Sequence, residues 1–529
     1  MSVAELLINV HKPWLNARVN TITIDSTSPP VPPSTRNTYF GAYAGSSTTT
    51  GNDNAGFGYV AEGGLTTGNE NVAVGSMAMQ QLTTGSRNVA IGYNSQNLGT
   101  AQLDCTSVGN ATLQNNTGTL NTAVGSSALN DNTTGTANTA VGYECMGSNT
   151  TGINNTAMGS SALTVCTTGA SNCTAMGYHA LLDCTVSQNT AVGALAGAQV
   201  STGTPNDLFG YSAGTSLTSG NQNVAIGASS LSSATTDANC IAIGYTALET
   251  ANGSENNIAI GVGALNLVQT AQSDIAIGTN AGATLSTGSY NTLVGYYAGN
   301  QLTSHQNNVA LGASALAAAD CTSTTAIGAN SLTAATSCDN CVGVGANTFL
   351  DASSISDSVA IGTSALHNVS TGTPNIAIGY AAASNLTTGS NNIYLGTLLS
   401  AGSISESGTM RLGVPGTQTN TIIAGSLATN QAQAPSAGTS VTATAIVGGM
   451  FIANGNCTLT TGSAIDTAYP NIATGNVLTL LLINNTGSSI TITGNTGTTL
   501  TSDTSMVVAA HMSRILYFYR TGTSAYAIY

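Results

Sequence analysis

The stretch "NVAVGSMAMQQLTTGSRNVAIG" (residues 71–92) opens with Asn-Val-Ala-Val-Gly and closes, seventeen residues later, with Asn-Val-Ala-Ile-Gly. The Gly that ends this five-residue phrase recurs twenty-two times between Gly41 and Gly396, and seventeen of the twenty-one intervals are 17 residues long. The other intervals are 16 or 18 residues. A period this regular is the signature of a repeat architecture in which each unit stacks on its neighbours.

With the Asn numbered as position 0, the unit reads N-x-A-φ-G-x-x-A-L and then a turn, where φ is an apolar residue. Alternating side chains bounded by Gly predict a short β-strand, because successive strand residues point to opposite faces. A helix is disfavoured, because each Gly inside one costs about 1 kcal/mol relative to Ala. The sequence therefore predicts an all-β fold: a parallel β-solenoid, or β-roll, of twenty-two coils.

One 17-residue coil cannot cover its own apolar residue, so coils must stack. Parallel strands lie about 4.8 Å apart, which gives a rod on the order of 105 Å long. We expect the apolar residue at position 3 to be hidden by stacking and to form the repeat core. Examples are Val74, Ile91, Val124, Val141, Ile226, Ile243, Ile260 and Ile277.

Position 0 is Asn in fifteen copies, and stacked identical Asn side chains can hydrogen-bond along a rod as a ladder. We favour this structural role over a ligand-binding role. The expected ladder includes Asn71, Asn88, Asn121, Asn138, Asn155, Asn189, Asn223 and Asn257. The departures are Cys105, Cys173, Cys240, Asp274, Thr324, Cys341 and Ser358, and the four Cys are expected to be small buried groups.

The repeat phrases "NVAVGSMAM", "NTAVGSSAL" and "NIAIGYAAA" resemble the head repeats of trimeric autotransporter adhesins, over about 360 of the 529 residues. That resemblance implies a left-handed parallel β-roll with three chains side by side. The segment "ESGTMRLGVPGTQTNTIIAGS" (406–426) resembles the end of such repeats in phage tail-fibre-like and giant-virus fibre proteins. The small residues at position 2 (Ala, Gly or Ser in eighteen copies) are expected to let neighbouring chains approach closely, in a symmetric assembly that covers exposed sheet edges.

Four segments follow from these patterns. Residues 1–36 read as an attachment or capping segment with a Pro-rich linker, since "PPVPP" (29–33) favours an extended spacer. Residues 37–400 form the β-solenoid, and residues 401–440 a neck and linker. Residues 441–529 contain longer strands split by Gly and Asn turns, which predicts an antiparallel β-sandwich or jelly-roll-like domain for trimerisation, capping or receptor binding.

Charge and hydropathy exclude several classes of partner. The chain has 21 acidic and 7 basic residues, and Arg87 is the only basic residue between positions 37 and 396. Nucleic acid is therefore not an expected partner, because phosphate binding depends on Lys and Arg. The sequence contains no run of about 18 apolar residues, the length that a membrane-spanning helix needs, so membrane insertion is not expected. The amino terminus shows no recognisable secretory signal.

Catalytic and metal-binding patterns are also missing. The five His residues are scattered, and no HExxH, phosphate-loop or EF-hand motif occurs. His511 near Asp503 and Ser513 can be drawn as a triad, but spacing alone does not give catalytic geometry. The CxxC at Cys338 and Cys341 has no second pair to complete a zinc site. We predict no enzyme activity, no cofactor and no metal.

Two pairs of Cys occupy equivalent loop positions on adjacent coils: Cys166 with Cys184, and Cys321 with Cys338. Stacked coils bring such positions to the Cα separation that a disulfide tolerates. We predict that each pair is in contact, and bonded in an oxidising setting. Asn-x-Ser/Thr sequons at Asn132, Asn149, Asn172 and Asn385 leave glycosylation open.

The leading interpretation is a non-enzymatic structural fibre, a homotrimeric rod on a virion or cell surface, attached to a virion component through residues 1–28. One alternative is an adhesin that binds a host-surface receptor or glycan through the rod face or residues 441–529. A second is a subunit of a head-to-tail extracellular filament, with residues 1–28 docking on the next subunit. A glycan depolymerase is disfavoured, because no carboxylate recurs at a fixed position of the repeat.

Overall fold

The computed structural model describes residues 36–166, 169–318 and 321–413 and, beyond them, nine strands between residues 440 and 528. The chain divides into two units, Met1–Thr419 and Asn420–Tyr529. The expectations for residues 1–35 and for the linker before residue 440 lie outside the described residues.

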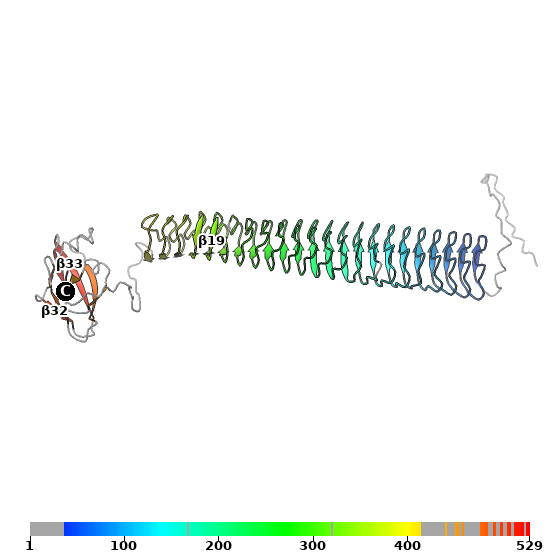
Figure 1. Cartoon of the computed structure of the whole chain (residues 1–529), viewed down its shortest axis with the longest axis horizontal. Coiled ribbons are helices and arrows are strands. Elements are labelled where there is room, and N and C mark those ends of the chain that lie inside the picture. The colour runs from blue at the N-terminus through cyan, green and yellow to red at the C-terminus, as the bar shows by residue number, and fades with distance from the viewer. Residues whose placement is uncertain are drawn as a thin grey trace, which may run out of the picture. The chain divides into compact units, whose positions relative to one another are not determined.

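In the first unit, short strands pair in chain order into one parallel sheet of 23 strands, and the coils that carry them stack into a rod (Figure 1). The described residues contain no helix. These findings confirm the predicted β-solenoid. The strands are β1 (Thr38–Phe40), β2 (Ala55–Phe57), β3 (Val72–Val74), β4 (Val89–Ile91), β5 (Thr106–Val108), β6 (Thr122–Val124), β7 (Thr139–Val141), β8 (Thr156–Met158), β9 (Thr174–Met176), β10 (Asn189–Val192), β11 (Asn206–Phe209), β12 (Asn223–Ile226), β13 (Ile241–Ile243), β14 (Ile258–Ile260), β15 (Ile275–Ile277), β16 (Thr292–Val294), β17 (Val309–Leu311), β18 (Thr325–Ile327), β20 (Val342–Val344), β22 (Val359–Ile361), β23 (Asn375–Ile378), β24 (Asn392–Leu395) and β25 (Met410–Leu412).

Two details extend the expected pattern. The sheet continues past residue 400 through β25, which pairs with β24 and so adds a further coil inside the expected neck. A separate two-stranded parallel sheet, β19 (Ser337–Asp339) with β21 (Ser354–Ser356), forms in the loops of two neighbouring coils.

The register places each position of the repeat on the same position of the next coil. Between β3 and β4, for example, Val72 faces Val89, Ala73 faces Ala90 and Val74 faces Ile91. Columns of equivalent side chains therefore run the length of the sheet. Each column is either inside or outside the coil, because strand side chains alternate between faces.

The structure corrects the expected core. Positions 0 and 2 point inward and are buried, whereas positions 1 and 3 point outward. Val74 is 39%, Ile91 39% and Ile226 41% exposed in the single chain. Of the other expected core residues, Val124 and Ile277 are also exposed, and Val141, Ile243 and Ile260 are only partly buried. The position 2 residues line the inside of their own coil, so the prediction that they let neighbouring chains approach closely is also wrong.

The actual core combines small residues at position 2 with Ala at position 7 and Leu or Met at position 8, as in Ala123, Ala128 and Leu129. The coil is narrow, and the larger side chain at position 8 fills it from the opposite wall. Only small residues therefore fit at position 2. Leu208 is an exception at position 2. It is accommodated because position 8 is Gly in its own coil and in the preceding one, where a Cβ on Gly214 or Gly197 would lie within 3 Å of Leu208.

The Gly at position 4 is required by both backbone conformation and space. From Gly41 to Gly396 its φ lies between +121° and +154°, a region that favours Gly. A Cβ added at any of these positions would lie close to the backbone of the next Gly in the column, 2.4 Å from the carbonyl oxygen of Gly261 in the case of Gly244. These two constraints account for the Gly in every copy.

In the second unit, the described strands form two mixed sheets. In one sheet, β26 (Ser440–Val441), β28 (Cys457–Leu459) and β30 (Ile490–Thr493) are parallel, and β32 (Ser505–Val508) is antiparallel to β30. In the other, β29 (Val477–Asn484) pairs in parallel with β27 (Met450–Ala453) and antiparallel with β33 (Ser513–Gly522). Next to β33 lies β34 (Ala525–Ile528), which pairs in parallel with β31 (Thr498–Leu500). The purely antiparallel arrangement expected from the sequence is thus replaced by mixed pairing.

Candidate functional site

The Asn residues at position 0 form a hydrogen-bonded ladder inside the coil, interrupted where another residue takes the place of Asn. The Oδ1 of Asn71 accepts hydrogen bonds from both the backbone N and the Nδ2 of Asn88, each at 3.1 Å. Asn88 Nδ2 also donates to the carbonyl of Gln102, 14 residues ahead, at 2.9 Å. Because buried polar groups are costly unless they are paired, these bonds make a polar core tolerable and fix the coil-to-coil register.

The other expected ladder residues are also buried, and they differ in whether an Asn precedes them. Asn138, Asn155 and Asn223 bond to the Asn one coil before. Asn121, Asn189 and Asn257 each follow a coil with Cys at position 0 and keep the bond to the carbonyl 14 residues ahead. A Cys therefore removes one side-chain link, while its backbone N still donates to the preceding Asn, as Cys240 N does to Asn223 Oδ1 at 3.0 Å.

Asp274 substitutes for Asn in this column and is fully buried. Its Oδ1 accepts hydrogen bonds from the N and Nδ2 of Asn291, at 2.7 and 3.0 Å. Its Oδ2 has no partner within the described residues. Burial raises the pKa of Asp274 to about 7. A protonated carboxyl is the form that can replace the donating amide of Asn.

A second ladder, not anticipated from the sequence, runs through the hydroxyl residues of the loops at position 12. The Oγ1 of Thr66 donates to the carbonyl of Thr83, and Thr83 Oγ1 donates to the carbonyl of Thr100, each at 2.9 Å. The same bond recurs farther along, from Thr218 to Thr235 at 3.0 Å and from Ser353 to Ser370 at 2.9 Å. The frequent Thr-Thr-Gly of the loops is the sequence signal for it.

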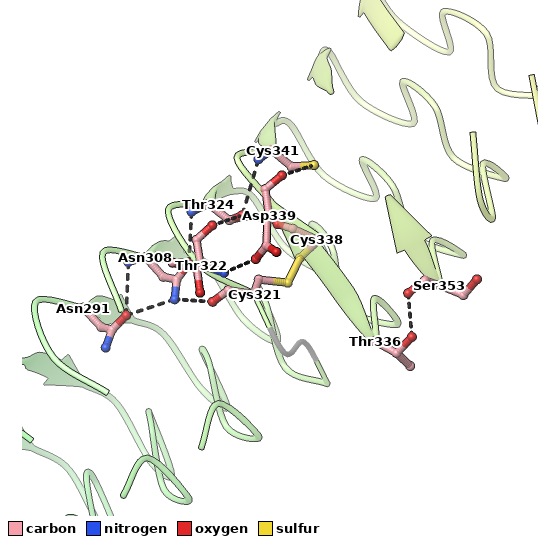
Figure 2. Close-up of a disulfide and its surroundings, with 10 residues drawn as sticks. All are labelled: Asn291, Asn308, Cys321, Thr322, Thr324, Thr336, Cys338, Asp339, Cys341 and Ser353. Carbon is pink, nitrogen blue, oxygen red and sulfur yellow. Dashed lines mark hydrogen bonds between the residues drawn. A yellow bond between two sulfur atoms is a disulfide. The ribbon is translucent and has the colours of Figure 1, made fainter. Parts of the chain in front are cut away.

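The predicted contact between Cys321 and Cys338 is confirmed, because the two form a disulfide with a Cα–Cα distance of 4.8 Å. Figure 2 shows this bond joining neighbouring coils beside the ladder residues, where Asn308 Nδ2 donates to the Cys321 carbonyl at 2.7 Å. Cys341 is a free buried thiol. The CxxC is therefore not a redox or metal pair.

The other predicted pair, Cys166 and Cys184, is buried and carries no disulfide. The thiol neighbour of Cys184 is instead Cys173 of the Asn column, and both donate to the carbonyl of Val186, at 3.2 and 3.3 Å respectively. Burial raises the pKa of the Cys166 thiol to about 12, so this thiol is not an activated nucleophile.

Both ends of the coil stack have a Tyr at position 2 with a nearby Glu. At the first coil, Tyr39 bonds Thr48 at 2.9 Å, and burial raises the pKa of Glu62 to about 8. Near the last coil, Tyr394 donates to Glu406, which also pairs with Arg411 at 2.8 Å. The Arg411 guanidinium lowers the pKa of Glu406 to about 2. Large polar residues thus end the core of small residues at both ends, as expected of capping units.

Outside the coil, positions 1 and 3 form two columns on the outer face of the sheet. Position 3 is Val, Ile, Leu, Met or Phe in all 23 strands, and position 1 is Thr, Val or Ile in twenty of them. Asp207 is the only charged residue in either column. The rod therefore presents one long strip that is apolar throughout position 3 and consists mostly of Thr, Val and Ile at position 1, and we call it the apolar strip.

The described metal-ligating side chains do not gather into a cluster. No group of three or more His, Cys, Asp or Glu residues that could hold a metal occurs among the described residues. His179 stacks on Tyr178 with ring centroids 3.8 Å apart, and His367 lies 3.8 Å from Asp351. The side chains of His511, Ser513 and Asp503 lie outside the described residues.

Among the sequons named above, those of Asn132 and Asn149 are closed to modification in the folded coil, because both side chains are buried and bonded to each other at 2.7 Å. Asn172 is exposed, and Asn385 is half-buried. Within the part of the chain that the structure describes, no helix is long and apolar enough to cross a membrane. Comparisons of the chain with protein-family models, with curated proteins and with solved structures found no match.

Proposed function

We propose that this protein is a non-enzymatic structural fibre in which three copies associate side by side through the outward apolar strip at positions 1 and 3. The observation that carries the proposal is this strip. A monomeric rod leaves it in water, although large contiguous apolar patches on soluble proteins mark interaction sites. Association of copies would bury the aliphatic side chains that the single coil leaves outside.

The strip is large enough for a stable interface. Twenty-three strands at about 4.8 Å give a length of about 110 Å, and two columns of side chains are about 10 Å wide, so the strip covers on the order of 1,000 Å². A stable protein interface buries about 800 Å² on each partner. In three parallel copies in the same register, equivalent positions of the repeat would also lie side by side along the rod.

The finer features of the fibre belong to the same proposal. The repeat phrases support left-handed winding and a trimer by their resemblance to adhesin heads, and the segment 406–426 supports a place on a virion surface. The two sheets of the second unit fit a sandwich that trimerises or caps the rod. An adhesive role for the rod is taken up in the next section.

Sedimentation equilibrium of the full chain tests the association. We expect a mass three times 52.4 kDa. The double variant Ile243→Asp/Ile260→Asp places charges on adjacent coils of the strip and should give monomers, because each charge would have to be buried without a partner. The matched control is Asn239→Asp/Asn256→Asp, on exposed residues that directly precede the same two coils and lie outside the strip.

The control should remain trimeric. A monomeric wild-type protein at micromolar concentration would overturn the proposal, and so would trimers that tolerate both charges in the strip. A dimer would refute the stoichiometry.

A further inference from the structure

A row of exposed tyrosines runs along the rod at position 5, directly after the repeat Gly. Seven of them follow one another at intervals of two or three coils: Tyr59, Tyr93, Tyr143, Tyr178, Tyr211, Tyr245 and Tyr296. Tyr380 lies five coils after Tyr296. The eight rings are 49% to 59% exposed. We call these eight residues the tyrosine row.

The row is separate from the apolar strip. The strand ends at position 3, and the Gly at position 4, with φ between +121° and +154°, turns the chain out of the sheet before the Tyr. The rings are therefore not part of the columns at positions 1 and 3. A side-by-side assembly through the strip does not by itself account for eight exposed aromatic rings.

The spacing keeps the rings of the row apart from one another. No two adjacent coils carry Tyr at position 5, and the coils between them mostly have Ser, Ala, Thr or Asn there. Tyr143 donates to Glu144 at 2.7 Å, Tyr178 stacks on His179, and Tyr296 contacts Tyr297. Tyr59 meets Tyr43 edge to face, with ring centroids 6.2 Å apart. Among the described residues, the side chains of the other four make no hydrogen bond or ring contact. An interval of two coils is about 10 Å, a length that two successive sugar rings of an extended polysaccharide also span.

We infer that the tyrosine row binds a neutral, extended polysaccharide, whose sugar rings stack on successive tyrosines. An exposed Tyr offers an apolar ring face and a polar hydroxyl, which suits the mixed surface of a sugar. The charges select a neutral polymer. Arg87 is the only cation between positions 37 and 396, and it is paired with Asp104 at 2.6 Å. Sixteen acids in the same span would repel an anionic glycan.

This inference goes beyond the structural role, because it gives the rod a ligand. It is tested by affinity electrophoresis of the full-length protein in gels that contain hydroxyethyl cellulose, and by binding to insoluble chitin, with alginate as the anionic comparison. We expect retardation by the neutral polymers and none by alginate. Tyr211→Ala/Tyr245→Ala should weaken binding about tenfold, through loss of two stacking surfaces.

The matched control is Tyr290→Ala, because Tyr290 is 62% exposed but lies at position 16, outside the row. It should bind as the wild type does. Failure to bind both neutral polymers, equal binding of alginate, or equal weakening by Tyr290→Ala would overturn the inference. The mass of each variant is measured in parallel. If Tyr211→Ala/Tyr245→Ala dissociates the assembly, the row is a contact between copies and not a glycan site, whereas a trimer that binds no glycan leaves the fibre role intact.

Discussion

Replacing Asp274 by Asn should stabilise the rod at neutral and alkaline pH and have little effect in acid. In an unbroken stretch of the ladder, each Asn donates its Nδ2 to the Oδ1 one coil back and to the carbonyl 14 residues ahead, as Asn223 does. By the repeat, Oδ2 of Asp274 occupies the place of that amide and faces Asn257 Oδ1 and the carbonyl of Gly288. Two acceptors facing an ionised oxygen repel it, whereas a protonated carboxyl donates to one of them.

The magnitude follows from the pKa shift. The folded pKa of about 7 lies roughly three units above the ordinary value of 3.8, and each unit corresponds to about 1.4 kcal/mol, so the full effect is about 4 kcal/mol. Below pH 4 the group is protonated in both the folded and the unfolded chain and costs nothing. Between pH 4 and 7 the folded chain holds more protons, so the free energy of unfolding falls as pH rises. Above pH 7 the loss is complete.

The assay is urea unfolding of the wild type and of Asp274→Asn from pH 4 to 9, with hydrogen exchange of the amide of Asn291 as a local readout, since that amide donates to Asp274. The stability difference should be small at pH 4 and grow to about 4 kcal/mol at pH 8. Asp183→Asn, which changes an exposed aspartate outside the apolar strip, should follow the wild-type profile. A difference between Asp274→Asn and the wild type that does not grow with pH would refute the reasoning.

Four further predictions follow from the same geometry. Gly244→Ala should lower the stability measured by thermal unfolding by more than about 2 kcal/mol, because the added Cβ would lie 2.4 Å from the Gly261 backbone. Gly253→Ala should lower it less, because Gly253 also has a positive φ but only Thr236 Oγ1 lies nearby, at 3.8 Å. Cys321→Ser should lose about 3 kcal/mol under oxidising conditions and match the reduced wild type, since the bond closes a loop with a sequence separation of 17. Leu208→Ala should lower the free energy of unfolding by about 2 to 5 kcal/mol. Adding Gly197→Leu and Gly214→Leu should restore it, because the coil would then have the usual small residue at position 2 and Leu at position 8. No gain in stability from these two additions would contradict the packing argument. Asp207→Thr should tighten self-association in sedimentation, because it removes the only charge of the apolar strip; weaker association would speak against the strip as the interface.

The repeat period was sufficient to predict the stacked coils, their number to within one, and the columns of equivalent residues. It did not reveal which face of each strand is inside. Strict alternation defines two faces, and the usual preference for burying Val and Ile over Ala and Asn selects the wrong one. The tertiary reason is the narrow coil, which has room for Ala73 and Asn71 but not for two β-branched residues per strand. The additional coil at β25 was missed because Arg411 breaks the phrase at position 2.

A signal for the correct face was nevertheless present in the sequence. In three of the four Gly-repeat coils with a large residue at position 2, namely those of Tyr39, Leu208 and Leu293, position 8 is Gly, and in the coil of Tyr394 it is the small Ser400. Compensation of this kind is needed only between side chains that share an interior. The two Cys pairs show when equivalent positions in the repeat are sufficient to predict a bond and when they are not. The contact between Cys321 and Cys338 follows from equivalent loop positions alone. Equivalent positions did not produce a bond between Cys166 and Cys184, where the neighbouring thiol is Cys173 of a different column.

The burial of small and polar residues, with the larger aliphatic residues outside, also explains why the coil relies on hydrogen bonds. Burying an Ala side chain yields far less hydrophobic free energy than burying an Ile, because that energy scales with apolar area. A core of Ala at positions 2 and 7 therefore needs the Asn and Thr ladders, which satisfy buried polar groups and hold each coil in register. The larger aliphatic side chains are then left on the outer face, as Ile226 shows with 41% of its surface exposed. A chain built this way has more apolar surface than one rod can bury, and association with further copies is the most direct way to cover it.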